Sequence, residues 1–223
     1  MDAPTIFGES IMILYGAPVS PYVRKVLAFA AEKGVALELV PIGLGDENPE
    51  FLACSPFRKM PGFTDGDFSI SDSTAIVTYI DAKHPEVPLI PVDPANRARA
   101  IWFDEFADTI LTAAAGAIFF NRIVSPKFLG KPGDDAVAAK GETDMTPVCQ
   151  YLEEVIRPSG YLVGDGLTLG DISVASPFVN AAHAGYVPDA DAYPKLTAFL
   201  TAIHERPSFA DWIRRERKML GLG

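Results

Sequence analysis

The first third of the chain places short apolar runs between turn residues in an order typical of a small mixed sheet. The run 12–15 predicts a strand, the segment 16–20 a turn, and the apolar residues that follow recur at helical spacing. Residues 35–41 alternate and predict a second strand, and a proline opens a short helix over 49–54. These elements form a β-α-β unit with a trailing helix.

A hairpin and a capped helix follow this unit. Residues 62–64 and 68–70 flank the turn 65–67, which has glycine at its centre and therefore predicts two antiparallel strands. Residues 71–73 supply hydroxyl and carboxylate caps for a helix that ends before Pro85. We predict that the hairpin completes the sheet.

The remainder of the chain shows helical periodicity without convincing strand alternation. Four prolines between Pro85 and Pro94 mark the boundary. We predict an α/β plus all-α protein, with a sheet domain over 1–85, a linker over 86–93 and an all-helical bundle over 94–223. The helices predicted in the bundle span 95–120, 134–156, 169–183, 192–203 and 208–220.

Composition and charge narrow the class of protein. The 223 residues are 48% hydrophobic and 22% charged, as in an ordinary soluble globular protein. The 19 Lys and Arg against 29 Asp and Glu give a net charge of -10, which disfavours nucleic acid and anionic membranes as partners. No apolar run approaches the roughly 18 residues of a membrane span. Cys54 and Cys149 have no paired spacing, and this favours the reducing cytoplasm.

The turn before the first helix carries a hydroxyl. Ser20 directly precedes Pro21, which suits the first helical position, so helix capping is the ordinary interpretation of this serine. The order of elements around it resembles the thioredoxin-like fold, whose redox members carry Cys-Pro-Tyr-Cys at this turn. Ser20 and Val23 stand at the two cysteine positions, which excludes thiol exchange here.

Several motifs, taken in order, resemble the cytosolic glutathione transferases over nearly the whole chain. The resemblance is to a serine-type, bacterial-like member. It implies a thioredoxin-like glutathione-binding domain, an all-helical electrophile-binding domain, a homodimer, and conjugation of the glutathione thiolate to an apolar electrophile in detoxification or aromatic catabolism. The motifs are 48–56, 58–61, 65–76, 88–91, 162–165 and 167–172.

The resemblance makes Ser20 the residue that activates the glutathione sulfur. A free thiol has a pKa of about 8.5, and lowering it to about 6.5 requires roughly 2.7 kcal/mol. A hydrogen bond to a charged group contributes about 1.5–3 kcal/mol and a helix N-terminus about 0.3–1 kcal/mol. Ser20 at the start of a helix could therefore supply this stabilisation by donating to the thiolate.

Five further residues are expected to bind glutathione on the same resemblance. The Met60–Pro61 bond is cis in the family, which leaves the backbone of Met60 free to pair with the cysteinyl part. Ser73 should hold the γ-glutamyl carboxylate at a helix N-terminus, while Asp72 stands where the family commonly has Glu. Lys59 could pair with the glycyl carboxylate, although an exposed lysine often does nothing measurable.

The electrophile pocket is expected between the domains, lined by the loop before Ser20 and the inner face of the first long helix. Tyr15 or Pro18 could contribute from the loop. The helical candidates share a spacing that any bundle core also needs, so core packing stays the favoured alternative for them. They are Asp108, Leu111, Thr112 and Ala115.

Other polar residues are interpreted as structural. Thr168 and Asp171 match a capping box. Arg24 is expected to form a structural ion pair. No metal is expected, since the histidines are single and show no ligand spacing; they are His84, His183 and His204.

The same motifs are compatible with alternative activities. The turn Ser20-Pro-Tyr-Val also resembles that of glutathione-dependent β-aryl etherases, and dehalogenase relatives use the same chemistry. A non-catalytic protein of this fold that binds glutathione or another ligand is the alternative from a different class.

Overall fold

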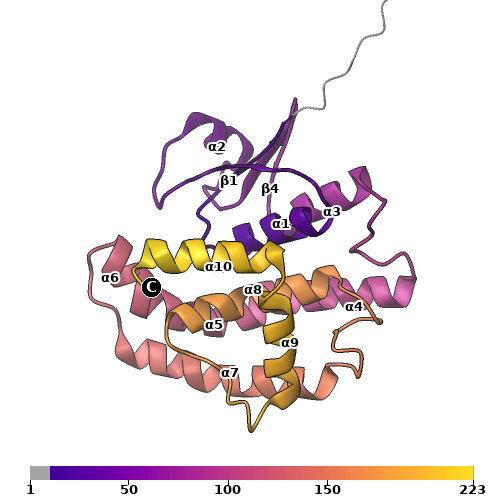
Figure 1. Ribbon diagram of the computed structural model, residues 1–223. Helices are drawn as coiled ribbons and strands as arrows, with labels where there is room; N and C mark the ends of the chain where they lie inside the picture. Colours follow the sequence, from indigo (N-terminus) through magenta and orange to yellow (C-terminus); the bar gives the residue numbers. More distant parts are fainter. Residues whose placement is uncertain (1–10, 223) are drawn as a thin grey trace, which may run out of the picture.

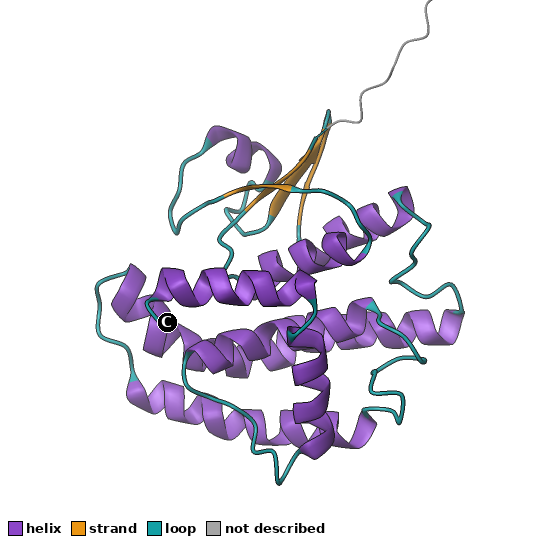
Figure 2. Ribbon diagram, viewed as in Figure 1, coloured by secondary structure: helices purple, strands orange, loops and turns teal. Residues whose placement is uncertain are grey.

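A computed structural model describes residues 11–222 of the chain, with a small sheet above a larger helical part (Figures 1 and 2). The sheet consists of β1 (Met12–Tyr15), β2 (Glu38–Val40), β3 (Gly62–Asp65) and β4 (Phe68–Ser71) in the order β2-β1-β3-β4. Strand β1 runs parallel to β2 and antiparallel to β3, and β3 and β4 form a hairpin. The β-α-β unit and hairpin predicted from the sequence are confirmed.

Helices cover both faces of the sheet. Helices α1 (Pro21–Glu32) and α3 (Ser73–Lys83) pack on one face, and α2 (Pro49–Cys54) lies against the other. Side chains alternate along a strand, so Leu14 enters the main core while Tyr15 joins the small apolar cluster beside α2. Helix α1 therefore lies between the sheet and the helical part, with its start near their junction (Figure 1).

Residues 84–93 contain no helix or strand and lead into one continuous helical segment. This segment comprises α4 (Pro94–Glu105), α5 (Thr112–Phe119) and α6 (Ser125–Phe128), joined by two π-helical turns, η1 (Phe106–Leu111) and η2 (Phe120–Val124). The predicted end at residue 120 is wrong, because η2 and α6 extend the helix to Phe128. Neither π-turn was predicted, because π-helical turns are rare and occur mostly as single turns inside α-helices.

Four more helices complete the helical part. They are α7 (Asp135–Val155), α8 (Leu169–His183), α9 (Pro194–His204) and α10 (Pro207–Leu220), each within two residues of its predicted bounds. Helix α8 is buried along almost its whole length and packs against α1, α4, α5 and α9. Thr168 and Asp171 form the predicted capping box at its start. Asp171 also accepts hydrogen bonds from the backbone N–H groups of Leu162 and Thr168, both at 2.8 Å.

The helical segment over 94–128 is more apolar than we expected from the sequence, where no run approached the length of a membrane span. Its most apolar window of 18 residues has a mean hydropathy of 1.3, so by length and composition alone the segment could span a bilayer. The expectation that no such segment exists is therefore wrong. The segment packs along α7 and α8, and Ala100, Phe103, Ala107 and Leu111 lie in the main core. Of that window 39% is buried inside the protein, and a helix that packs one face into a bundle can have the same composition without any membrane.

Candidate functional site

The turn that carries Ser20 packs tightly onto the helix it starts. A Cβ added to Gly16 would lie 2.4 Å from Cγ2 of Val23, so only glycine allows this approach. Ser20 is the N-cap of α1, and its carbonyl accepts the backbone N–H of Arg24 at 2.9 Å. Its side chain makes no capping hydrogen bond, although serine usually makes one at this position. The half-buried hydroxyl of Ser20 is therefore not committed to the backbone of its helix.

The segment before β3 lies beside this turn. The Met60–Pro61 peptide bond is cis, as expected. The backbone N–H of Ala17 approaches Sδ of Met60 at 3.2 Å and so joins the two segments. The backbone of Lys59 is fixed through Oγ of Ser55, which donates to its carbonyl at 2.7 Å, while the side chain of Lys59 is exposed. The positions predicted for the cysteinyl and glycyl parts of glutathione are therefore next to the Ser20 turn.

The start of α3 adds a second group of polar atoms. Asp72 is the N-cap, with φ at 85°, and its carboxylate accepts the backbone N–H of Ala75 at 3.0 Å. A residue other than glycine at such a positive φ is strained, and conformations of this kind concentrate at functional sites. Ser73 follows as the first helical residue and is buried, with Oγ 3.4 Å from Oδ2 of Asp108.

A buried charge cluster, which the sequence did not predict, lies behind Ser73. Nζ of Lys25 contacts a carboxylate oxygen of Asp104 and one of Asp108, both at 2.7 Å. Oγ1 of Thr74 donates to Asp104 at 2.7 Å. Burial raises the pKa of Asp108 to about 6, and Asp104 adds to this, because one lysine can neutralise only one of two carboxylates. Burial alone would lower the pKa of Lys25, but the two carboxylates outweigh it and raise that pKa.

Tyr22 connects the first turn of α1 to the helical part. Its hydroxyl donates to the backbone carbonyl of Asp108 at 3.1 Å, and burial raises its pKa. The contact places a half-buried aromatic ring between Ser20 and η1, where we expected the electrophile. Sequence reasoning overlooked Tyr22, although its position two residues after Ser20 was a usable signal.

Some of the residues predicted to line the electrophile pocket are buried in the core, and others lie near the junction of the sheet and the helices. Tyr15, Leu111 and Ala115 are 5%, 0% and 0% exposed and lie in the apolar core clusters. Leu111 and Ala115 agree with the alternative of core packing. Tyr15 was expected at the pocket but is buried in the small apolar cluster, so none of the three is assigned to the pocket. Asp108 carries the charge contact with Lys25 rather than lining an apolar wall. Two candidates stay near the junction.

These two are Pro18 and Thr112, both half-buried. Pro18 lies in the turn itself, two residues before Ser20. The hydroxyl of Thr112 donates to the carbonyl of Ala107 at 2.6 Å, which leaves its methyl group as the apolar side. Thr112 also starts α5 directly after η1, the turn that Tyr22 contacts.

Arg24 forms the structural ion pair expected of it. Its guanidinium binds the carboxylate of Glu216 on α10 in bidentate fashion, with Nε and Nη2 at 2.8 and 2.6 Å, and both side chains are fully buried. Burial alone would raise the pKa of Glu216, but Arg24 and His183 outweigh it and hold that pKa below its usual range. His183 contacts the same carboxylate at 2.9 Å.

The thiols of the chain do not provide a nucleophile. Cys54 and Cys149 are both free and buried, and burial raises the pKa of each thiol. Within residues 11–222, no three His, Cys, Asp or Glu side chains come close enough together to hold a metal ion.

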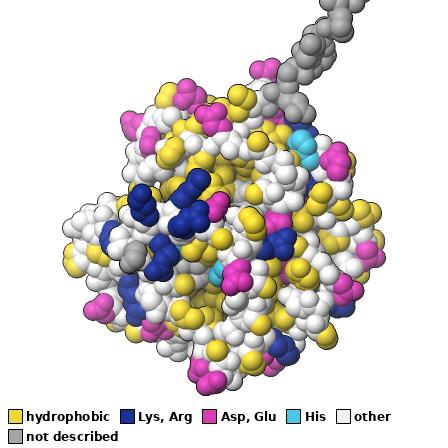
Figure 3. Space-filling view, in the orientation of Figure 1, with side chains coloured by type: hydrophobic (Ala, Val, Ile, Leu, Met, Phe, Trp, Pro, Cys, Tyr) yellow, Lys and Arg dark blue, Asp and Glu magenta, His cyan; other side chains and the backbone are white. Residues whose placement is uncertain are grey.

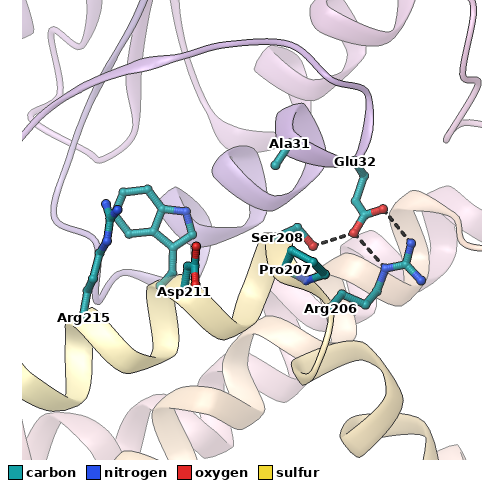
Figure 4. A pocket seen from close by; sticks show the side chains of 8 residues that line it. Ala31, Glu32, Arg206, Pro207, Ser208, Asp211 and Arg215 are labelled. Carbon is teal, nitrogen blue, oxygen red and sulfur yellow. Dashed lines mark hydrogen bonds and ion pairs between the residues drawn. The ribbon is translucent and has the colours of Figure 1, made fainter.

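The cavity between α1 and α10 is separate from the Ser20 turn. Its volume is about 430 Å³, and Figure 4 shows Glu32 pointing from α1 toward Arg206 and Ser208. The Glu32 carboxylate accepts hydrogen bonds from Arg206 at 2.7 Å and Ser208 at 2.5 Å, while Arg215 lies over the ring of Trp212. These polar groups already satisfy one another. Lys and Arg side chains gather on the face shown in Figure 3. Helix α10 carries Arg214, Arg215, Arg217 and Lys218, of which the last two lie in its last turn.

Comparisons with known proteins match both parts of the chain. The model of the glutathione S-transferase N-terminal domain matches residues 14–88, and that of the C-terminal domain matches residues 124–216. A curated glutathione S-transferase from Hyoscyamus muticus is 32% identical over 206 residues, which cover 89% of this chain and 96% of the relative.

Solved structures agree with these matches. Glutathione S-transferase I from maize, in complex with an atrazine glutathione conjugate, is 30% identical with a TM-score of 0.81, and the match covers 92% of this chain and 97% of that one. A glutathione S-transferase from Rhodospirillum rubrum is 25% identical with a TM-score of 0.83 and covers 91% of both chains. The fold of this chain, a thioredoxin-like sheet followed by helices, agrees with both solved structures.

Proposed function

This chain belongs to the glutathione S-transferase family, and from that premise we propose that Ser20 activates the thiol of glutathione. The protein is a transferase that joins the sulfur of its co-substrate glutathione to an apolar electrophile. One observation carries the assignment of Ser20: its hydroxyl stands at the N-terminus of α1 and caps no backbone group. It is thus free to donate to a thiolate, which makes the enzyme a serine-type member.

The tripeptide runs from this hydroxyl along the two neighbouring segments. The γ-glutamyl carboxylate binds at the start of α3, where the buried Ser73 and the N-terminal N–H groups favour an anion. Asp72 contributes less, because its carboxylate already accepts the N–H of Ala75. The backbone of Met60, before Pro61, pairs with the cysteinyl part.

Lys59 attracts the glycyl carboxylate. Its backbone is fixed by Ser55 while its side chain reaches into solvent, so the contribution to binding is small. Among the described residues, neither backbone polar group of Met60 takes part in the turn and loop hydrogen bonds of the chain, which supports its role in pairing with the ligand.

The electrophile binds at the junction of the two domains, against Pro18, the ring of Tyr22 and the methyl group of Thr112. The hydrogen bond from Tyr22 to η1 supports this placement, because it holds an aromatic face beside the Ser20 turn. An apolar wall there excludes water from the thiolate and so strengthens the nucleophile. We assign residues 1–85 to the glutathione-binding domain, 86–93 to the linker and 94–223 to the electrophile-binding domain.

A homodimer is the assembly we propose. Large apolar side chains are exposed on both domains: Phe57 is 84% exposed after α2, and Trp102 and Ile110 are 50% and 48% exposed on the long helical segment. Contiguous exposed apolar patches mark protein interfaces, and we propose that these side chains belong to one. Light scattering of the wild type and of a Phe57→Ser variant tests the proposal, and a monomeric wild type would contradict it.

The cytoplasm is the proposed location, since both cysteines are free thiols and a reducing compartment keeps them so. Detoxification or aromatic catabolism is the proposed context. A panel comprising a chloronitrobenzene, a β-aryl ether and a haloalkane separates conjugation from ether cleavage and dehalogenation, because each releases a different product.

The test of the catalytic proposal compares wild type with Ser20→Ala. Both proteins should be retained on immobilised glutathione, but only the wild type should conjugate a chloronitrobenzene at an appreciable rate. Ser159→Ala is a suitable control, because this serine bonds only within an exposed loop. Equal turnover by wild type and Ser20→Ala would refute the role of Ser20.

A further inference from the structure

Two polar side chains of α8 hold the peptide carbonyls on either side of Ser20. Oγ of Ser176 donates to the carbonyl oxygen of Pro21 at 2.7 Å, and Nδ2 of Asn180 donates to the carbonyl oxygen of Val19 at 2.8 Å. Both α8 side chains are buried, at 1% and 2% exposed. The residue between the two anchored carbonyls is the one we assign to the thiolate.

The orientation of the Asn180 amide is fixed by Arg24. Nη1 of Arg24 donates to Oδ1 of Asn180 at 2.9 Å and to the backbone carbonyl of Ser176 at 2.7 Å. Because a guanidinium can only donate, the amide oxygen must face Arg24 and the amide NH₂ must face Val19. Glu216 holds Arg24 from the opposite side. A continuous buried network thus connects α10 to the Ser20 turn.

A buried carbonyl needs only one hydrogen-bond donor, and the carbonyl of Pro21 has more than that. The carbonyl of Pro21 lies in the first turn of α1, where the helix itself supplies an N–H, and Ser176 adds a second donor from another domain. Anchors on both sides of a residue restrict its φ and ψ, here −72° and 128°, and hence the direction of its Cα–Cβ bond. Hydrogen-bond strength falls steeply with angle, so this direction matters to a donor that must reach one sulfur.

We propose that Asn180 and Ser176 are positioning residues that aim the Ser20 hydroxyl at the sulfur of glutathione. The inference rests on the proposed role of Ser20 and extends it to the helical domain. Neither side chain touches the substrate; each acts through the backbone of the turn. Loss of either anchor lets the turn rotate and weakens the hydrogen bond to the thiolate, while the start of α3 continues to bind the γ-glutamyl end.

Two substitutions separate the anchor from the rest of the network. Asn180→Asp keeps an oxygen for Arg24 and nearly the same shape, removes the donor to Val19 and adds a negative charge beside Arg24, whereas Ser176→Ala leaves the charge of the network unchanged. Ser176→Ala removes the donor to Pro21 and the longer contact of 3.2 Å from Nη1 of Arg24 to Oγ of Ser176, while Arg24 keeps its hydrogen bond to the backbone carbonyl of Ser176. Ser125→Ala is the matched control, since Ser125 is a buried serine that also donates to loop carbonyls, those of Lys131 and Pro132, but makes no contact with the Ser20 turn.

The measurement is the pKa of bound glutathione, from its thiolate absorbance, together with the pH profile of kcat. Asn180→Asp and Ser176→Ala should each raise that pKa by about half a unit to one unit, which is part of the contribution of one charged hydrogen bond. Their kcat should fall by up to about tenfold below the pKa and return to the wild-type value at high pH. The KM for glutathione should change less than about twofold, and Ser125→Ala should leave the titration unchanged.

A purely structural role predicts a different pattern. Reduced folding would lower activity by the same factor at every pH and leave the pKa of the bound thiol unmoved, and this result for both variants would overturn the proposal. Combining Ser176→Ala with Ser20→Ala should raise the pKa no further than Ser20→Ala alone, because the anchor acts only through that hydroxyl. An additive shift would also overturn it. If Ser20→Ala alone leaves the pKa unchanged, the proposed function fails instead.

Discussion

Replacing Ser20 by alanine tests the electrostatics of the site most directly. The substitution removes one hydrogen bond to the glutathione thiolate, which contributes about 1.5–3 kcal/mol when one partner is charged. At about 1.36 kcal/mol per unit, the pKa of bound glutathione should rise by about one to two units. Because the Ser20 side chain makes no capping bond, its loss leaves α1 intact and the change reports on the thiolate alone.

In Ser20→Ala, the N-terminus of α1 still stabilises the thiolate of bound glutathione. The helix runs over Pro21–Glu32 whether or not the hydroxyl is present, and its N-terminus stabilises a nearby anion by about 0.3–1 kcal/mol. Starting from a free thiol pKa of about 8.5, the wild type should titrate between about 5.6 and 7.2, and Ser20→Ala between about 7.8 and 8.3.

The assay is an ultraviolet titration of the thiolate at saturating glutathione. Ser20→Thr provides the control, because threonine keeps a hydroxyl at the same position and should titrate much closer to the wild type. If Ser20→Ala and the wild type share one titration curve, another donor stabilises the sulfur and the reasoning is refuted.

Three further predictions concern binding, pH and folding. Ser73→Ala should raise the KM for glutathione by about tenfold with little change in kcat, since it removes a ground-state contact of about 1.4 kcal/mol; steady-state kinetics with unchanged KM would exclude Ser73 from the site. Burial raises the pKa of Asp108 from an ordinary value of 3.8 to about 6, so the folded protein binds this proton more tightly than the unfolded chain. The stabilisation from this proton is present below about pH 4 and lost as the pH rises through 6. Between about pH 4 and 6, the free energy of unfolding of the wild type should therefore fall by up to about 3 kcal/mol relative to that of Asp108→Asn, as measured by urea unfolding. Parallel plots of this free energy against pH for the two proteins would contradict the prediction. Asp171→Ala should lower stability by at least about 3 kcal/mol, because it leaves the buried donors of Leu162 and Thr168 unpaired; Asp171→Asn, which keeps an acceptor, should lose less in thermal unfolding.

The elements of the fold could be read from the sequence because they depend on local patterns. The hairpin at β3 and β4 follows from alternation around a glycine turn, and the capping box at Thr168 and Asp171 follows from residue spacing. The same patterns placed Ser20 at a helix start. They could not show that its hydroxyl caps no backbone group, because that depends on the conformation of the turn.

The remaining features of the site depend on contacts between distant elements. Periodicity put Asp108 and Leu111 on one face, but only the tertiary structure shows that the first pairs with Lys25 while the second is buried in the core. The polar stripe of α8 did carry a signal that was overlooked: polar residues recur every three or four positions in a helix that is otherwise apolar. The stripe comprises Ser173, Ser176, Asn180 and His183.

Helix α1 belongs to the sheet domain in sequence, yet both of its buried cations are neutralised by the helical domain. Arg24 meets Glu216, and Lys25 meets Asp104 and Asp108. In an N-terminal fragment produced alone, Arg24 and Lys25 would lose these carboxylate partners on the surface that contacts the helical domain. A buried charge without a partner is strongly destabilising. Attempts to build chimaeras by exchanging the helical half with that of a relative should therefore transfer α1 together with it, or carry the three carboxylates across.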